Sequence, residues 1–248
     1  MRTNIYHISY TPANKEVSLF FWGCNFRCLG CLCLKKNQNF LLSENLHLPF
    51  EEPRGIDPAP TVFLSLSELM DILGKLDFER VLLEGQEAAL DPVYGTITEK
   101  LHAEYRCRNI LCTNLYYLPD LSHTDAIVAS IKVMDKDRHK EYTGGSVEQV
   151  KNNFEEVYKR GVPVSVTTVY IPGYIDLDEI EDTATYIASV EKNTLLNIVP
   201  YFKAGQNHWR HPTPEEMYAA SEVAKKHLLR VFCWTGYEKM NCEVIKIY

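Results

Sequence analysis

The chain's most chemically distinctive stretch is FFWGCNFRCLGCLCLK, residues 20–35, which holds four of its eight cysteines. Cys24, Cys28 and Cys31 follow the spacing C-x₃-C-x₂-C, directly after an apolar run. Three thiolates in so short a loop can ligate three corners of a [4Fe–4S] cube. The fourth iron of such a cube would have no protein ligand and would be free to bind a small molecule.

The fourth cysteine of this stretch, Cys33, leaves a second interpretation open, in which all four thiolates hold a structural zinc ion. Zinc knuckles pair two C-x₂-C units, and this chain has no second C-x₂-C or H-x₃-H unit. The spacing therefore favours the iron–sulfur site, with Cys33 as a small thiol outside the ligand set. Cys233 and Cys242 lie beside apolar segments, where free cysteine is commonly buried, and they are too few for a second cluster.

Length, composition and charge narrow the classes of protein further. The chain has 248 residues, of which 46% are hydrophobic, so it can bury a sizeable core. Its net charge of −7 argues against nucleic acid as a partner, because phosphate binding usually leaves a basic surface. No apolar run is long enough to cross a membrane, and the N-terminal MRTNIYHISY lacks the apolar stretch of a secretory signal. We therefore expect a cytoplasmic protein, where clustered cysteines indicate a metal site rather than disulfides.

Short apolar runs alternate with helical stretches along most of the chain. We expect strands at 16–22, 80–84, 109–114, 125–133, 162–173, 195–201 and 228–234, and helices at 65–76, 91–105, 146–161, 176–190 and 213–228. Such alternation predicts βαβ units and a parallel sheet, in either a doubly wound fold or an open (β/α) barrel. In both folds, ligands gather at the carboxyl ends of the strands. The cysteines follow the first strand, and the irregular segment 36–61 directly after them is in a position that is often functional.

The cysteine motif at the end of the first strand resembles that of the radical S-adenosylmethionine (SAM) superfamily. The resemblance implies an α/β fold, a partial (β/α)6 barrel of TIM type with a parallel sheet and outer helices. It implies a single radical SAM domain over 1–248, with a core at about 16–232, the long loop 36–61 and a C-terminal extension at 233–248. It also implies that SAM binds the open iron and is split by one electron into methionine and a 5′-deoxyadenosyl radical, which takes a hydrogen atom from the substrate.

Two segments after the second and third strands extend the resemblance. LLEGQEAAL (82–90) resembles the superfamily's Gly-Gly-Glu motif, which holds the amino group of SAM. Gly85 and Glu87 match this motif, and Gln86 replaces its second glycine. A carboxylate near a ligand ammonium is favourable electrostatically. LCTNLYY (111–117) resembles the TNG segment and contributes Asn114.

Later segments resemble the glycyl-radical-enzyme activases. In 127–146, Lys132 matches the lysine of their DLK element, which contacts SAM, and Ser130 stands where the acid is expected. LLNIVPYFKAGQNHW (195–209) resembles their ELLPYHxxGxxKW, with Tyr201 as a match and Phe202 in place of a histidine that lies near SAM. The residues implied to bind the cofactor are therefore Gly85, Glu87, Asn114, Ser130, Lys132, Tyr201 and Phe202.

The position before the third cysteine departs from the superfamily. An aromatic residue usually stands there and packs on adenine, but here the residue is Gly30, which leaves Trp22 or Phe26 as candidates for that contact. Tyr142 is a candidate substrate contact, because its segment resembles the activase loop after the fourth strand, beside which a peptide substrate can bind. His208 and His211 follow the sixth strand, at the expected substrate end.

The resemblance favours an activase that takes a hydrogen atom from a glycine of a partner enzyme and leaves a glycyl radical there. Such an enzyme needs a one-electron donor, for which flavodoxin or ferredoxin is expected. Two alternatives stay open: the same radical chemistry on a peptide, a cofactor precursor or a nucleotide, and a non-enzymatic electron-transfer or zinc protein in which Cys33 closes the site.

Overall fold

The sheet consists mainly of parallel strands that follow one another in chain order. The computed structural model describes residues 1–45, 57–238 and 241–248. Its parallel strands are β2 (Glu16–Phe21), β3 (Arg80–Gly85), β4 (Arg108–Thr113), β5 (Ala126–Ser130), β6 (Val164–Tyr170), β7 (Leu195–Pro200) and β8 (Arg230–Cys233). Each of the strands expected from the sequence is present, with ends that differ by a few residues.

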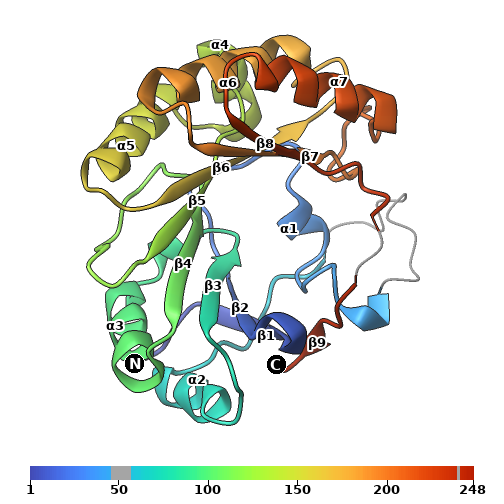
Figure 1. The fold of residues 1–248 in the computed structure, drawn as a ribbon. Coiled ribbons are helices and arrows are strands. Elements are labelled where there is room, and N and C mark those ends of the chain that lie inside the picture. Colours follow the sequence, from blue (N-terminus) through green and yellow to red (C-terminus); the bar gives the residue numbers. More distant parts are fainter. Residues whose placement is uncertain (46–56, 239–240) are drawn as a thin grey trace.

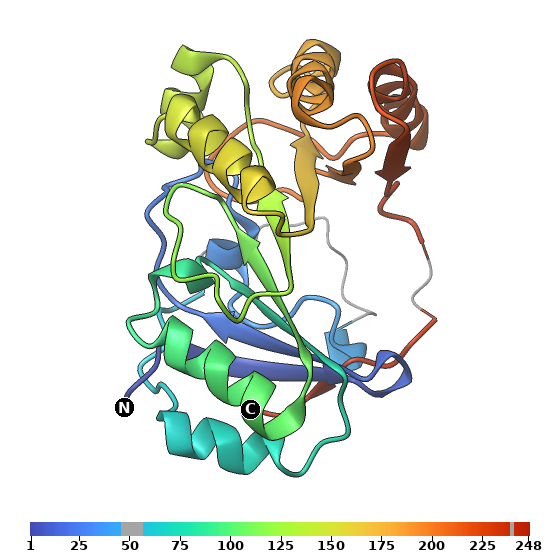
Figure 2. The same cartoon turned by 60° about the vertical axis from the view of Figure 1, so that its left-hand side comes forward.

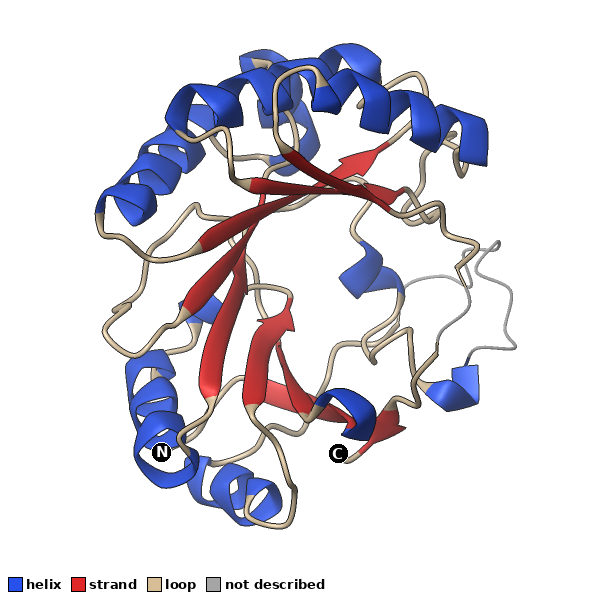
Figure 3. Cartoon of the chain, viewed as in Figure 1, coloured by secondary structure: helices blue, strands red, loops and turns tan. Residues whose placement is uncertain are grey.

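The sheet curls into an arc whose outer side carries the long helices (Figure 1; Figure 3). These are α2 (Leu66–Leu73), α3 (Tyr94–Tyr105), α5 (Val147–Lys159), α6 (Leu177–Val190) and α7 (Pro214–Lys225), preceded in the β5–β6 connection by α4 (Lys136–Thr143). The short α1 (Leu32–Lys35) lies on the inner side of the arc (Figure 1). Because the long helices cover only one face, the fold is an open partial barrel rather than a doubly wound sheet.

A hairpin at the N-terminal edge was not expected from the sequence. Strand β1 (Ile5–Thr11) pairs antiparallel with β2, and β9 (Ile245–Lys246) pairs antiparallel with β1. Strands β8 and β9 thus lie at opposite edges of the sheet (Figure 2). Ser43 donates its backbone N–H to Val244 O at 3.0 Å.

Single turns of 3₁₀ helix occur at Pro12–Asn14, Ser43–Asn45 and Ala88–Leu90. In the expected long loop 36–61, residues 46–56 lie outside the described residues. A hydrogen bond joins the described residues before and after that gap: the backbone N–H of Asn37 donates to Asp57 Oδ2 at 2.8 Å. None of the described helices is long and apolar enough to span a membrane.

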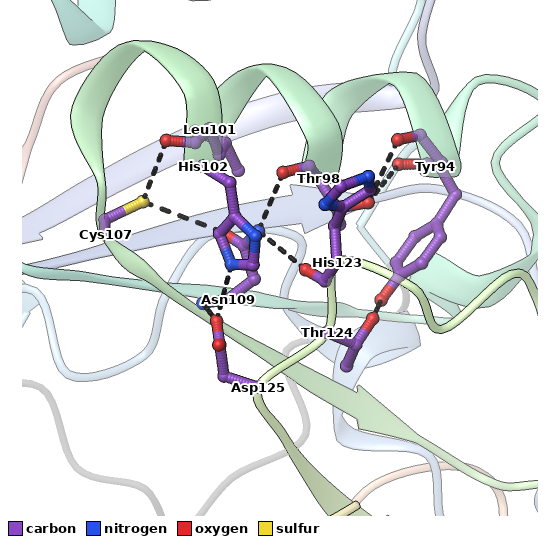
Figure 4. A network of polar contacts seen from close by, with 10 residues as sticks. Tyr94, Thr98, Leu101, His102, Cys107, Asn109, His123, Thr124 and Asp125 are labelled. Carbon is purple, nitrogen blue, oxygen red and sulfur yellow. Dashed lines mark hydrogen bonds and ion pairs between the residues drawn. The ribbon is translucent and has the colours of Figure 1, made fainter.

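The connection from β4 to β5 contains no helix within residues 114–125, all of which the structure describes. A polar network at the amino ends of these two strands joins them to α3 instead (Figure 4). The buried Asn109 amide donates to Thr98 O at 2.9 Å and to His123 O at 2.8 Å. His102 Nε2 lies 2.7 Å from Asp125 Oδ2.

Side chains along the strands alternate between two environments. On β3, Val81 and Leu83 are fully buried, whereas Leu82 and Glu84 are partly exposed. The same alternation occurs on β4, where Leu111 is buried. The apolar core therefore lies between the strands and the outer helices, and the inner side of the arc remains accessible and partly polar.

Candidate functional site

The cysteine loop begins at the carboxyl end of β2 and is tied to the neighbouring strand ends. Gly23, at φ +105°, donates its N–H to Gln86 Oε1 at 2.9 Å. Farther along the loop, Arg27 donates its backbone N–H to Thr143 O at 2.8 Å and Leu29 donates to Tyr142 O at 3.0 Å. The backbone of the loop is thereby held between the end of β3 and the last turn of α4.

The three cysteines of the motif lie near one another without forming a compact group. Desolvation raises the pKa of the Cys24 thiol to about 12, and the nearby Glu87, Cys28 and Cys31 add to that rise. Within the described ranges, no three His, Cys, Asp or Glu side chains are close enough to hold one metal ion. A zinc ion needs all its sulfur ligands at about 2.3 Å from one point, whereas a cube accepts thiolates at separate corners. Cys24, Cys28 and Cys31 are the residues that would hold such a cube, one thiolate at each of three corners.

Cys33 differs from the other three cysteines of this stretch. Its Sγ donates to Gly85 O at 3.0 Å. Its interaction with the neighbouring Cys31 lowers the pKa of the Cys31 thiol and raises the pKa of Cys33. Cys33 is thus the partner that keeps its proton, and it points toward the end of β3.

The end of β3 supplies a close backbone approach and a buried carboxylate. Gly85 has φ +99°, and a Cβ there would lie 2.8 Å from Phe21 N. Glu87 is 2% exposed and accepts the backbone N–H of Asn114 at 2.8 Å and that of Ala89 at 3.3 Å. Burial raises the pKa of Glu87 to about 7. Its charge can be offset by a cation that enters the site.

Lys132, after β5, brings a positive charge to the same place. Its charge opposes the rise in pKa that burial causes at Cys28 and at Glu87, so it lies near both. Lys132 Nζ donates to Ser130 Oγ at 3.2 Å, so the two cofactor residues predicted in 127–146 lie together at the end of β5. A carboxylate and an ammonium beside one cysteine loop can receive a zwitterionic ligand, with its amino group toward Glu87 and its carboxylate toward Lys132.

Tyr142 and Tyr201 lie beneath the cysteine loop. Tyr142 is 2% exposed and Tyr201 is 1% exposed. A Cβ on Gly30 would lie 2.8 Å from Tyr201 Cε2 and 3.1 Å from Tyr142 Oη, so the two tyrosines occupy the space that a side chain at position 30 would need. Trp209 packs on Tyr142, with ring centroids 5.9 Å apart. The sequence marks Gly30 as unusual but gives no sign of these neighbours.

The remaining candidates at the end of β7 divide into two groups. Phe202 and His211 are brought together, with ring centroids 5.1 Å apart, and His211 Nδ1 lies 2.8 Å from Tyr201 O. His208, in contrast, is exposed.

The two candidates for an aromatic contact with adenine are also in different environments. Phe26 is 5% exposed, and its ring fills the space beside Gly145, where a Cβ would lie 2.3 Å from Phe26 Cε1. Trp22 is partly exposed and packs edge-on against Tyr6, at 5.7 Å between ring centroids. Of the two, Trp22 is the more exposed.

Three of the other cysteines differ in burial. Cys107 is buried in the core. Cys233, on β8, is partly exposed and packs against the core, with its Sγ 3.2 Å from Met217 O. Cys242 is partly exposed.

Comparisons with known proteins agree with the motif. The family model of the "Radical SAM superfamily" matches residues 19–187. Over 240 residues the chain is 25% identical to a provisionally named glycyl-radical enzyme activating enzyme of Methanocaldococcus jannaschii, which covers 94% of this chain and 86% of the relative. Over 207 residues it is 27% identical to the pyruvate formate-lyase-activating enzyme of Staphylococcus aureus, covering 77% of this chain and 76% of the relative.

A solved structure has the same fold. The structure of TYW1 with a lysine–pyruvate adduct bound aligns with a TM-score of 0.58 over 88% of this chain and 76% of that chain. The two sequences are 13% identical, so this likeness concerns the fold alone.

Proposed function

Because the chain belongs to the radical SAM superfamily, we propose that it is an activase that generates a glycyl radical on a partner enzyme. In this proposal Cys24, Cys28 and Cys31 hold a [4Fe–4S] cluster and SAM binds beside it. When bound, the two cofactors supply a 5′-deoxyadenosyl radical that removes a hydrogen atom from the substrate.

The observation that carries the proposal is that the loop of three cysteines lies beside a buried carboxylate, Glu87, and a lysine, Lys132. Glu87 is held by two backbone N–H groups and is desolvated, so an incoming ammonium group would gain a strong charge-assisted contact. Lys132 offers the complementary contact for a carboxylate. Gly85 lets the backbone at the end of β3 pack directly on β2, which leaves the strand ends close to the cysteine loop.

Support for the activase role comes from the relatives. Both curated relatives bear the names of activating enzymes, and one of them aligns with 94% of this chain. The accessible inner side of the arc, on which the partly exposed Glu84 lies, would receive the substrate segment. A flavodoxin or a ferredoxin would supply the electron, and we place the reaction in the cytoplasm.

Anaerobic reconstitution with iron and sulfide tests the proposal in stages. We expect about four iron and four sulfide per chain, and 5′-deoxyadenosine after addition of SAM and a reductant. With a candidate glycyl radical enzyme present, electron paramagnetic resonance should show a glycyl radical on that partner. The Cys24→Ala variant should give neither product.

Each stage has a result that contradicts it. Zinc in place of iron, with no cleavage of SAM, would overturn the radical chemistry altogether. Cleavage of SAM without a glycyl radical on any candidate partner would overturn the activase role and leave another radical SAM reaction, such as modification of a peptide, a cofactor precursor or a nucleotide.

A further inference from the structure

We infer that Asn114 is a positioning residue for the first cysteine of the motif, and that its amide raises the reduction potential of the cluster. This inference rests on the proposed function. It gives Asn114 a task different from direct contact with SAM: the side chain donates a hydrogen bond to the sulfur of Cys24.

The contacts of the Asn114 side chain determine which way its amide points. Nδ2 lies 3.5 Å from Cys24 Sγ and 2.8 Å from Asn25 Oδ1, so each N–H of the amide has an acceptor. Oδ1 accepts the backbone N–H of Tyr116 at 2.8 Å. The reversed amide would set its NH₂ group against that backbone donor and its oxygen against Asn25 Oδ1, so the orientation with nitrogen toward sulfur is the favourable one.

The turn that carries Asn114 is held on several sides. Asn114 is 7% exposed, and its backbone N–H donates to Glu87 Oε2 at 2.8 Å. The next residue, Leu115, adopts φ +59°. Its carbonyl accepts from Asn153 Nδ2, on α5, at 2.7 Å. With both faces of the turn bonded, the amide has little freedom to leave Cys24.

A hydrogen bond to a ligand sulfur acts on the charge of the group that the sulfur binds. The reduced cluster carries one more negative charge than the oxidised one, so a donor at the sulfur stabilises the reduced state more. Cys24 Sγ also accepts the backbone N–H of Phe26 at 3.3 Å, a contact that a change at position 114 leaves in place. Removal of the Asn114 amide should therefore lower the midpoint potential without removal of a ligand.

The test uses full-length reconstituted protein without SAM, titrated anaerobically and followed by electron paramagnetic resonance of the reduced cluster. Asn114→Asp keeps the oxygen that accepts the Tyr116 N–H but loses the donor. Asn114→Leu loses the donor without adding a charge. Asn153→Ala is the matched control. It removes an asparagine amide of α5 that donates to the same turn, at Leu115 O, rather than to the sulfur. Iron content is measured in each variant.

We expect all variants to bind iron, and both Asn114 variants to be harder to reduce. At a fixed solution potential the ratio of reduced to oxidised cluster should fall about tenfold, which is about 59 mV for a one-electron couple. Asn153→Ala keeps the Asn114 donor, so it should shift the potential much less than either Asn114 variant.

Two results would overturn the inference alone. One is an unchanged potential in Asn114→Leu, in which case a shift in Asn114→Asp would be an effect of the added charge. The other is an equal shift in Asn153→Ala. If Asn114→Leu binds no iron, an unshifted Asn114→Asp also overturns it. A wild-type protein that binds no cluster overturns the proposed function as well.

Discussion

At the amino ends of β4 and β5 the polar side chains are paired with one another, whereas just after the carboxyl end of β3 a buried side-chain amide lacks a partner within the described part of the chain. Both amide hydrogens of the buried Asn109 are used, and Tyr94 Oη lies 2.8 Å from Thr124 Oγ1 (Figure 4). At the other end, Gln86 Nε2 is buried and has no hydrogen-bond partner among the described residues.

The difference is the one expected between a region that stabilises the fold and a region proposed to bind ligands. A buried polar group without a partner costs about 1–3 kcal/mol, so natural proteins keep such groups mainly where a ligand or a reaction needs them. The amino end gains stability from satisfied hydrogen bonds. The carboxyl end holds a desolvated Glu87 and a close backbone approach at Gly85, the residues that in our proposal bind the cofactor.

The largest difference between the two ends should appear when a proposed cluster ligand at the carboxyl end is removed. Cys24→Ala should abolish cluster binding and cleavage of SAM, because the remaining two cysteines hold too few corners. Cys107→Ala, at the amino end, should lower stability and leave activity per folded molecule unchanged, and Cys33→Ala should retain cleavage. Iron content and 5′-deoxyadenosine are the measurements. Full iron content in Cys24→Ala would remove that residue from the ligand set.

A change at the end of β3 should affect both stability and binding. Gly85→Ala would place a Cβ 2.8 Å from Phe21 N in a backbone conformation of φ +99°. We expect a loss of about 2–4 kcal/mol in the free energy of unfolding, and weaker SAM binding. Gly144→Ala is the control, since φ is +79° there but the space is open, and it should cost only about 1 kcal/mol. Equal losses in urea unfolding would contradict the close approach.

A change in the amino-end network should affect stability only. Asn109→Ala leaves Thr98 O and His123 O without their donor, which should lower the free energy of unfolding by about 1–3 kcal/mol. Activity per folded molecule should equal that of the wild type after reconstitution. A clear loss of SAM cleavage at full folding would show that the two ends are coupled.

The smallest effect concerns pH. Burial raises the pKa of Glu84 from its ordinary value of 4.5 to about 7. Between these values Glu84 in the folded chain binds a proton that it has lost in the unfolded chain, so its contribution to stability is greatest below pH 4.5 and is lost as pH rises through about 7. In the apoprotein, Glu84→Gln should reduce the decline in urea stability between pH 5 and pH 8 by about 1 kcal/mol. Identical declines in the two proteins would contradict this assignment.

The sequence predicted the parallel strands and most helices because hydrophobic periodicity is a local property. It failed for α4 (Lys136–Thr143), whose side chains are mostly polar, and for β1 and β9, which pair across nearly the whole length of the chain. Tyr142 was predicted as a substrate contact from its segment. Its burial beneath Gly30 depends on how α4 packs, which no local pattern reveals.

The sequence by itself determined the chemistry that is available: three cysteines at the spacing of an iron–sulfur loop, after a strand, in a chain of alternating strands and helices. Those features depend on neighbouring residues alone. Only the tertiary structure decided which groups surround the cysteines, because the curl of the sheet brings the carboxyl ends of separate strands together. It places Asn114 against Cys24, 90 residues away, and puts two tyrosines where Gly30 has no side chain.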